Sequence, residues 1–330
     1  MATLAATRPT LADWAKRLDP TGKTASIVEL LSQSNEVLPD MLWQEGNLPT
    51  GSRITVRTGL PTVYWRLLNA GVPSSKSTTA QVDEMCGNLE ARSEVDVDLA
   101  KLNGNTAEFR LSEGSAFVEA MNQEMVGTMF YGNSGTAPEE FTGLAPRYSS
   151  LSAGNGQNVL SGSGSGSDNA SIWLIGWSAD KVFGLFPKGS MAGLQHKDLG
   201  EGDAFDASNN RYRAYMDLWK WNCGLAVKDW RYVVRIANID ISNLVAKSSA
   251  ADLIELMIKA THRIPNLQGC SPAFYMNRTC FQMLDIQKRD DAIAGGGLTY
   301  DLVDGVPVAK FRGIPVRKVD QLLETEATVS

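Results

Sequence analysis

The chain has 330 residues, of which 43% are hydrophobic and 21% are charged, so it can bury two or three domains' worth of core. Its formal net charge of −6 at pH 7 argues against a protein whose main task is to grip the phosphate backbone of nucleic acid. The sequence has no apolar run long enough to cross a membrane and no signal-peptide pattern at its start. We therefore expect a globular protein that stays where it is made or leaves by cell lysis.

Residues 10–22 predict a short amphipathic helix. Thr10 can cap it, with Asp13 three residues later, and Pro20 and Gly22 end it. The apolar stripe at helical spacing consists of Leu11, Trp14, Ala15 and Leu18. Because so short a helix is marginal alone, it either packs as an ordinary terminal helix or forms an arm that lies on a neighbouring subunit.

Residues 46–80 predict a long, projecting hairpin. Two β-rich stretches, Arg53–Arg57 and Thr62–Leu68, are joined through residues 58–61, and Gly and Pro flank them. An isolated two-stranded hairpin is marginally stable in water, so we expect it to find a partner.

Two helices are predicted next. Leu89–Leu102 places Val95, Leu99 and Leu102 on one face and ends at residues 103–104. A longer helix follows, capped by Ser112 or Ser115 and ending at about Phe130. Its inner face is expected to carry Phe117, Met121, Met125 and Thr128.

The middle of the chain combines a polar stretch with an aromatic one. Residues 152–169 are rich in Gly and Ser and predict a flexible surface loop, without a motif that would cradle phosphate. The strand pair Ile172–Trp177 and Lys181–Pro187 follows. Residues 213–239 hold three tryptophans, two tyrosines and the strand Tyr232–Ile236, a composition typical of a large contact surface.

Basic residues lie among these aromatics, which superficially resembles a nucleic-acid stacking platform. However, Asp217 and Asp229 lie among them too. Arginine with tryptophan and tyrosine is equally typical of protein interfaces. We therefore favour an interface over a nucleic-acid site.

The last third of the chain alternates helix and strand. The expected features are a helix capped at Ser249 and Asp252, a buried strand Ala273–Met276, a helix capped by Asn277, an exposed loop at Gly295–Gly297, and strands near Val306–Phe311 and Ile314–Val319 separated by Arg312-Gly313. No regular βαβ repeat is present, which predicts the α+β class.

Groups that could carry chemistry are few and scattered. The histidines and cysteines have neither metal-ligand nor C-x-x-C spacing; they are His196, His262, Cys86, Cys223, Cys270 and Cys280. We expect reduced, mostly buried thiols. The carboxylate pairs, such as Glu139-Glu140 and Asp290-Asp291, lie beside Gly, Pro or basic residues, as solvated carboxylates do. No catalytic residue, metal site or cofactor is expected.

Five segments resemble the major capsid proteins of tailed bacteriophages. They are LLSQSNEVLPDMLWQEGNLPTGSRITVRTGLPTVYWRLLNAGV, NSGTAPEEFTGLAPRYSSL, WKWNCGLAVKDWRYVVRIANID, PAFYMNRTCFQMLD and FRGIPVRKVDQLLETE, and they span most of the chain. The likeness is to the short-tailed-phage branch related to the epsilon15 and Bordetella phage capsid proteins. It implies an α+β fold of the Hong Kong 97-like type.

The resemblance also implies a division of the chain. The parts are an N-terminal arm at 1–45, an extended loop at 46–80, a peripheral domain at 81–239, an axial domain at 240–310, and a C-terminal strand at 311–330 that returns to the peripheral domain. The spine helix of the peripheral domain would be residues 112–130, with Leu89–Leu102 as the alternative, and its flexible loop residues 152–169.

The function implied is that of a major capsid protein, a virion component assembled in the cytoplasm of the bacterial host. Copies would form hexamers and pentamers of an icosahedral shell around double-stranded DNA, with portal, scaffolding and possibly decoration proteins as further partners, and with no cofactor and no membrane. A Lys–Asn crosslink through Lys76 is not expected. The expected intersubunit contacts are Trp14, Trp43, Arg53, Arg57, Trp65, Arg66, Arg147, Trp219, Trp221 and Trp230. The alternative is a soluble α+β metabolic enzyme or a ligand-binding protein.

Overall fold

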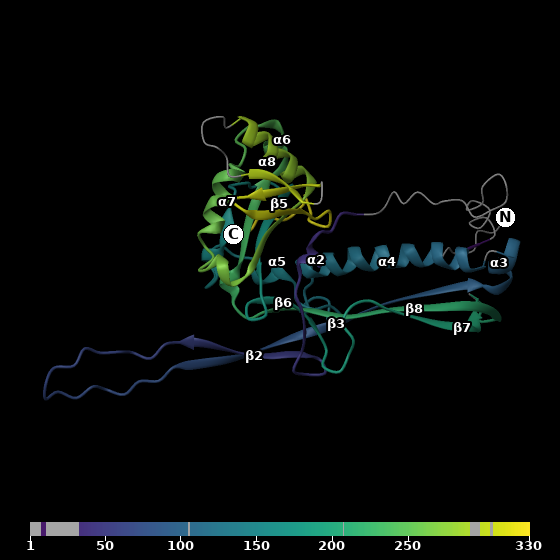
Figure 1. The fold of residues 1–330 in the computed structure, drawn as a ribbon, viewed down its shortest axis with the longest axis horizontal. Coiled ribbons are helices and arrows are strands. Elements are labelled where there is room, and N and C mark those ends of the chain that lie inside the picture. The colour runs from purple at the N-terminus through teal and green to yellow at the C-terminus, as the bar shows by residue number, and fades with distance from the viewer. Residues whose placement is uncertain (1–7, 11–32, 105, 207, 291–297, 304–305) are drawn as a thin grey trace.

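The structure, a computed structural model, describes residues 8–10, 33–104, 106–206, 208–290, 298–303 and 306–330. The predicted N-terminal helix with Trp14 and the predicted loop at Gly295–Gly297 lie outside these residues. The described chain has three parts: a compact lobe, an elongated body and a ribbon. The ribbon projects in the direction opposite to the end of the body that carries α3 (Val97–Lys101) and β7 (Gln195–Phe205) (Figure 1).

The body is a long helix that lies along an antiparallel sheet (Figure 1). Its elements are α3, α4 (Thr106–Tyr131), the second part of β3 (Thr78–Asp96), β7 and β8 (Arg211–Val227), and β2 (Gly51–Gly59) continues the sheet into the ribbon. The strands follow the order β7-β8-β3-β2. Gly114 lets α4 approach the sheet closely, because a Cβ atom there would lie only 3.2 Å from the Trp219 ring.

The ribbon and the body share one strand. β3 has 19 residues, and its first part pairs with β2 from Thr78↔Gly59 to Met85↔Gly51. Its second part pairs with β8 from Cys86↔Gly224 to Asp96↔Ala214. The ribbon is therefore β2 with residues 78–85, and residues 60–77, here called the ribbon loop, connect its two strands.

The lobe is a strongly buried sheet covered by helices. Its elements are β4 (Val159–Ser161), β5 (Asn169–Trp177), β9 (Val233–Asp240), α6 (Ile241–Ala246), α7 (Leu253–Thr261), β10 (Ser271–Met276), α8 (Arg278–Asp290), β11 (Leu298–Val303), β12 (Val306–Phe311) and β13 (Ile314–Lys318). All nine residues of β5 are buried, because β9 and β10 flank it and both of its faces are covered. A run of apolar residues is what such a central strand requires.

Lobe and body meet at β6 (Val182–Phe186). This strand pairs with β8, with β5 through the single pair Trp177↔Val182, and with β1 (Trp43–Glu45). Two short helices, α2 (Val37–Asp40) and α5 (Leu144–Arg147), complete the structure. Among the described residues, 13 strands are connected by hydrogen-bonded pairs. No helix in these parts of the chain is long and apolar enough to cross a membrane.

Several predicted elements are confirmed. Residues 112–130 lie in α4, which begins earlier, at Thr106. Asp252 caps α7 by accepting a hydrogen bond of 2.8 Å from the Glu255 backbone N–H. Asn277 caps α8 through the backbone N–H of Cys280, also at 2.8 Å. The predicted strands 172–177, 273–276, 306–311 and 314–319 correspond to β5, β10, β12 and β13.

Other predictions are wrong. Leu89–Leu102 is not a helix: its first part belongs to β3, where pairing with β8 decides the conformation, and only residues 97–101 form α3. Thr62–Leu68 contains no strand, because β3 takes the place of partner to β2. Residues 152–169 are not a free loop, since β4 pairs with β9 and the Gly162 and Gly164 backbone N–H groups bond to that strand's carbonyls.

Candidate assembly surfaces

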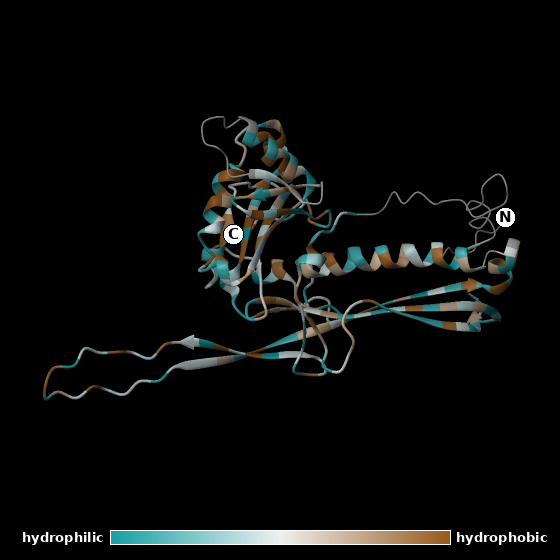
Figure 2. Cartoon of the chain, viewed as in Figure 1, coloured by the Kyte–Doolittle hydropathy of each residue, from teal (hydrophilic) through white to brown (hydrophobic). Residues whose placement is uncertain are grey.

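The ribbon loop exposes a run of large apolar side chains. Trp65 is 104% exposed and Leu68 is 93% exposed. The other exposed large apolar residues of the loop are Leu60, Val63, Tyr64, Leu67 and Val72. Figure 2 shows hydrophobic segments on this outstretched part of the chain, far from the lobe. Contiguous apolar surface of this kind marks an interaction site on a soluble protein.

The energy available from this loop is considerable. Burial of one exposed large apolar side chain contributes roughly 1.5–3 kcal/mol, so the seven together could contribute about 10 kcal/mol or more. The charge of the ribbon loop is one-sided: no acidic residue occurs between Glu45 and Asp83, whereas Arg66 and Lys76 in the loop and Arg57 beside it are basic. A partner surface that combines apolar and acidic groups would complement it.

The predicted contact residues Trp219 and Trp221 lie inside the body, which corrects the expectation that they are buried mainly by sister copies. Trp219 is 5% exposed, and its ring stacks on Phe117 of α4 at 4.9 Å. Trp221 is 9% exposed, and its ring lies 6.0 Å from that of Trp43. Their large apolar area stabilises the packing of α4 and β1 on the sheet.

Arg147 also finds its partner within the chain. Its guanidinium binds both carboxylate oxygens of Glu84 at 2.6 Å. Trp230 is half-buried against the main core, and its carbonyl accepts a hydrogen bond of 2.7 Å from the Tyr148 hydroxyl. Arg53 is exposed and pairs with Asp83 at 2.6 Å on the ribbon itself. Among the predicted contact residues that the structure describes, Arg57, Trp65 and Arg66 are therefore the ones that are exposed and have neither an ion pair nor packing against the core.

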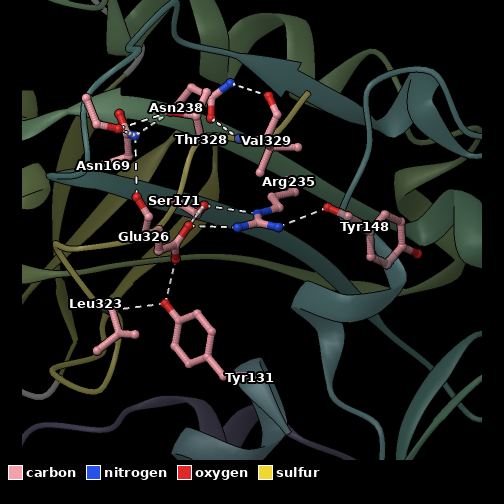
Figure 3. A network of polar contacts seen from close by, with 11 residues as sticks. Tyr131, Tyr148, Asn169, Ser171, Arg235, Asn238, Leu323, Glu326, Thr328 and Val329 are labelled. Atoms are coloured by element: carbon pink, nitrogen blue, oxygen red, sulfur yellow. Dashed lines mark hydrogen bonds and ion pairs between the residues drawn. The ribbon is translucent and has the colours of Figure 1, made fainter. Parts of the chain in front are cut away.

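A buried polar network fixes the C-terminal segment to the lobe (Figure 3). Arg235 of β9 and Glu326 form an ion pair of 2.7 Å, and both side chains are 5% exposed. Arg235 also donates to the Ser171 hydroxyl at 3.0 Å and the Tyr148 carbonyl at 2.9 Å. Ser171 and the Tyr131 hydroxyl donate to the Glu326 carboxylate. The carboxylate is therefore satisfied from three sides, as a buried charge must be.

Two buried asparagines extend this network toward the chain end (Figure 3). The side chain of Asn238 exchanges two hydrogen bonds of 2.8 Å with the backbone of Val329. Asn169 donates to the backbone carbonyl of Gly166 at 2.6 Å. These residues were not predicted from the sequence. The available signal is the pair of polar residues Arg235 and Asn238 inside the strand 233–239, whose other residues are apolar.

A second polar cluster ties α4 to the far end of the sheet. Arg110 of α4 binds Asp217 at 2.7 Å and Asp198 at 2.8 Å. The hydrogen bond from Arg110 holds the pKa of Asp198 below its ordinary value. His196 is on β7, where it bonds to Asp217 at 2.9 Å and stacks on Trp219. Both carboxylates bind the same guanidinium, so the cluster joins α4 to β7 and β8 and has a structural role.

The described residues offer little for chemistry. They contain no group of three or more His, Cys, Asp or Glu side chains that could hold a metal ion. Burial raises the pKa of Cys86 to about 11 and that of Cys223 and Cys280 to about 12, so these thiols are protonated at neutral pH. One groove of about 560 Å³ runs between the edge of β2 and residues 180–181 and 228–231, but it is open and carries no acid–base pair in an apolar setting.

Comparison with known proteins gives a consistent assignment. The model of the family described as major capsid protein GP7 matches residues 19–330. A chain of the cryo-EM structure of bacteriophage epsilon15 is 30% identical, with a TM-score of 0.75, and the match covers 100% of this chain and 99% of that one. No curated protein matches the sequence.

Two more distant structures are similar in outline. The capsid of bacteriophage JBD30 matches 92% of this chain and 99% of its own at 9% identity, with a TM-score of 0.49. The capsid of a native GTA particle matches 70% and 99% at 10% identity, with a TM-score of 0.47. Because both scores lie below 0.5, they add nothing to the epsilon15 likeness.

The family match and the epsilon15 likeness agree with the described geometry. The α+β fold predicted from the sequence, of the Hong Kong 97-like type, is confirmed. The alternative of a metabolic enzyme finds no support in the family match or in the epsilon15 likeness. The chain belongs to the major capsid protein GP7 family.

Proposed function

We propose that copies of this chain build the icosahedral shell of a tailed phage by joining into hexamers and pentamers. The protein is a virion component that associates with itself. The observation that best supports the proposal is the ribbon loop, which carries Trp65 and six other exposed large apolar residues away from a folded body. A chain that exposes such a surface outside its packed lobe and body is suited to contact with sister copies.

In this proposal, each copy places its ribbon loop on the next copy around the capsomer. The contact is heterologous, because the loop of one copy meets a different surface of its neighbour, and such contacts close into rings. Trp65 and its apolar neighbours supply most of the free energy. Arg57 and Arg66 pair with carboxylates of the neighbour, and each exposed pair contributes only about 0–1 kcal/mol.

The axial domain, the long helix and the N-terminal residues also have places in the capsomer. Residues 240–310, whose described part lies in the lobe, form the axial domain that meets its copies at the capsomer centre, and α4 is the spine helix of the peripheral domain. Residues 1–45 form an arm toward a neighbour, with Trp14 as its contact, whereas Trp43 packs on Trp221 within its own chain. Portal, scaffolding and possibly decoration proteins join the shell, and double-stranded DNA is confined without specific binding, in accord with the net charge of −6. The proposal includes no catalytic step.

The experiment is to express the untagged full-length chain and sediment the native lysate. We expect megadalton particles that negative-stain microscopy shows as closed shells. A chain that remains monomeric or dimeric under every assembly condition, with or without co-expressed phage proteins, would contradict the proposal.

A further inference from the structure

The ribbon leaves the body at a defined point on β3. Cys86 is the first residue that pairs with β8, and Met85 is the last that pairs only with β2. Glu84, paired with Ser52 across the ribbon, therefore lies two residues before the body sheet begins. Any contact made by this side chain acts where the ribbon begins.

Arg147 and Glu84 form a bidentate ion pair. Nη1 and Nη2 of Arg147 bind Oε1 and Oε2 of Glu84, each at 2.6 Å. Arg147 is itself held, because it also donates to the backbone carbonyls of Thr142 at 3.0 Å and Gly143 at 3.1 Å. The Glu84 side chain is 5% exposed. A bidentate pair of this kind fixes an angle as well as a distance.

An apolar contact on the same face of the ribbon supplies attachment. Ile54, which pairs with Val82, is 7% exposed and packs with Phe183 and Leu185 of β6. Val56, two residues farther along β2, is half-buried and packs on the same cluster, whereas Val82, opposite Ile54, is exposed. Apolar packing is non-directional. Of the two contacts, the bidentate pair is therefore the more directional one.

The ribbon magnifies any change at this point. From Ser52 to Gly59 the paired part extends about 23 Å at the usual rise of about 3.3 Å per residue. A rotation of about 10° at Glu84 therefore moves its far end by about 4 Å. The ribbon loop lies farther out still, so its displacement is larger.

We infer that the Arg147–Glu84 pair is a positioning element for assembly: it sets the direction in which the ribbon leaves the body, and so decides whether the ribbon loop reaches its site on the neighbouring copy. This inference rests on the proposed function. Arg147 acts through Glu84 and the ribbon and needs no contact with the neighbour.

The chain contains a matched control one residue away. Arg53 and Asp83 also form a bidentate pair, at 2.6 and 2.8 Å, between β2 and β3. Their side chains are 51% and 52% exposed. Because successive side chains of a strand point to opposite faces, Asp83 faces away from the body. Its pair links the two strands of the ribbon to each other and not to the body.

The experiment compares Glu84→Gln and Arg147→Lys with Asp83→Asn and Arg53→Lys in the full-length, unassembled chain. Spin labels at Ala70→Cys in the ribbon loop and Ala116→Cys on α4, both exposed positions, report the distance from loop to body. All variants share a background in which the two half-buried cysteines are replaced, Cys86 by Ala and Cys270 by Ser. Circular dichroism verifies that each variant is folded.

We expect Glu84→Gln and Arg147→Lys to shift or widen the distance distribution by about 4 Å or more and to lose closed particles. Asp83→Asn and Arg53→Lys should match the parent in both measurements. The inference is overturned if the two groups give the same distance distribution, or if the ribbon is displaced and closed particles still form in parental yield. If the parent itself forms no particles, the proposed function fails, while the distance measurement still decides whether the pair orients the ribbon.

Discussion

The hydroxyl of Tyr131, at the last residue of α4, donates a hydrogen bond of 2.6 Å to the carboxylate of Glu326 near the end of the chain. The same oxygen accepts a hydrogen bond of 3.0 Å from the backbone N–H of Leu323. The long helix of the body and the C-terminal segment of the lobe are thus joined at one phenol. Since Glu326 also binds Arg235 of β9, this contact connects body and lobe through buried polar groups.

Tyr131→Phe should destabilise the unassembled chain by roughly 1.5–3 kcal/mol, because it removes a hydrogen bond to a buried charged group. The change also leaves the Leu323 N–H without its acceptor. Urea unfolding followed by tryptophan fluorescence measures the effect. Tyr64→Phe, in the exposed ribbon loop, is the matched control and should leave the unfolding free energy unchanged. Equal effects of the two substitutions would show that the phenol of Tyr131 has no role in this joint.

Glu326→Ala should destabilise the folded chain by about 3–5 kcal/mol, more than Tyr131→Phe, because it leaves the buried Arg235 without its counter-charge. Glu324→Ala is the control, since Glu324 is exposed two residues earlier in the same segment. Thermal unfolding of both variants, with amide exchange of residues 323–330, gives the comparison. If Glu326→Ala unfolds at the parental temperature with a protected C-terminal segment, the network does not fix the chain end.

Trp219→Ala should reduce the stability of the isolated chain, whereas Trp65→Ala should reduce its assembly. Trp219 lies between the sheet and α4, so its removal should destabilise the isolated chain by about 3–5 kcal/mol. Trp65 contacts little within its own chain, so its removal should leave unfolding unchanged and reduce assembly into particles. Denaturant unfolding and native sedimentation of both variants separate the two roles. A stable Trp219→Ala chain that fails to assemble would restore the original view of Trp219 as an intersubunit contact.

Asp198→Asn should lower the free energy of unfolding above pH 3.8, the ordinary pKa of the carboxyl group, and should have no effect on it in strong acid. The hydrogen bond from Arg110 lowers the pKa of Asp198 in the folded chain, so the stabilisation is present above pH 3.8 and is lost as the pH falls through the folded value. Since the carboxylate is 52% exposed, the effect should stay below about 1 kcal/mol. Urea unfolding of parent and variant across the acid range tests this, with Asp180→Asn as control. A difference that persists unchanged into strong acid would contradict it.

Local signals in the sequence identified elements whose determinants lie within one or two turns of chain. Asp252 and Asn277 were recognised as caps because a cap bonds to an N–H three residues later. The turn at Arg312-Gly313 was likewise predicted, and both residues have the positive φ that such a turn needs.

Long-range pairing accounts for the main errors. Val95, Leu99 and Leu102 have helical spacing, yet residues 89–96 form a strand because β8 lies beside them, more than a hundred residues away in sequence. The exposed Trp65 and the buried Trp219 are the same residue type, and no local pattern separates them. For Arg147 the deciding partner is Glu84, 63 positions away in the chain. The ribbon loop could be located from the sequence, whereas the residues that orient it could not.

The most direct test of this account is hydroxyl-radical footprinting of Trp65 in unassembled chain and in purified particles, read by mass spectrometry. Trp219 serves as the internal reference, because it is buried in both states. The account predicts strong labelling of Trp65 in the unassembled chain and protection in particles, with weak labelling of Trp219 throughout. Equal labelling of Trp65 before and after assembly would contradict the claim that sister copies bury the ribbon loop.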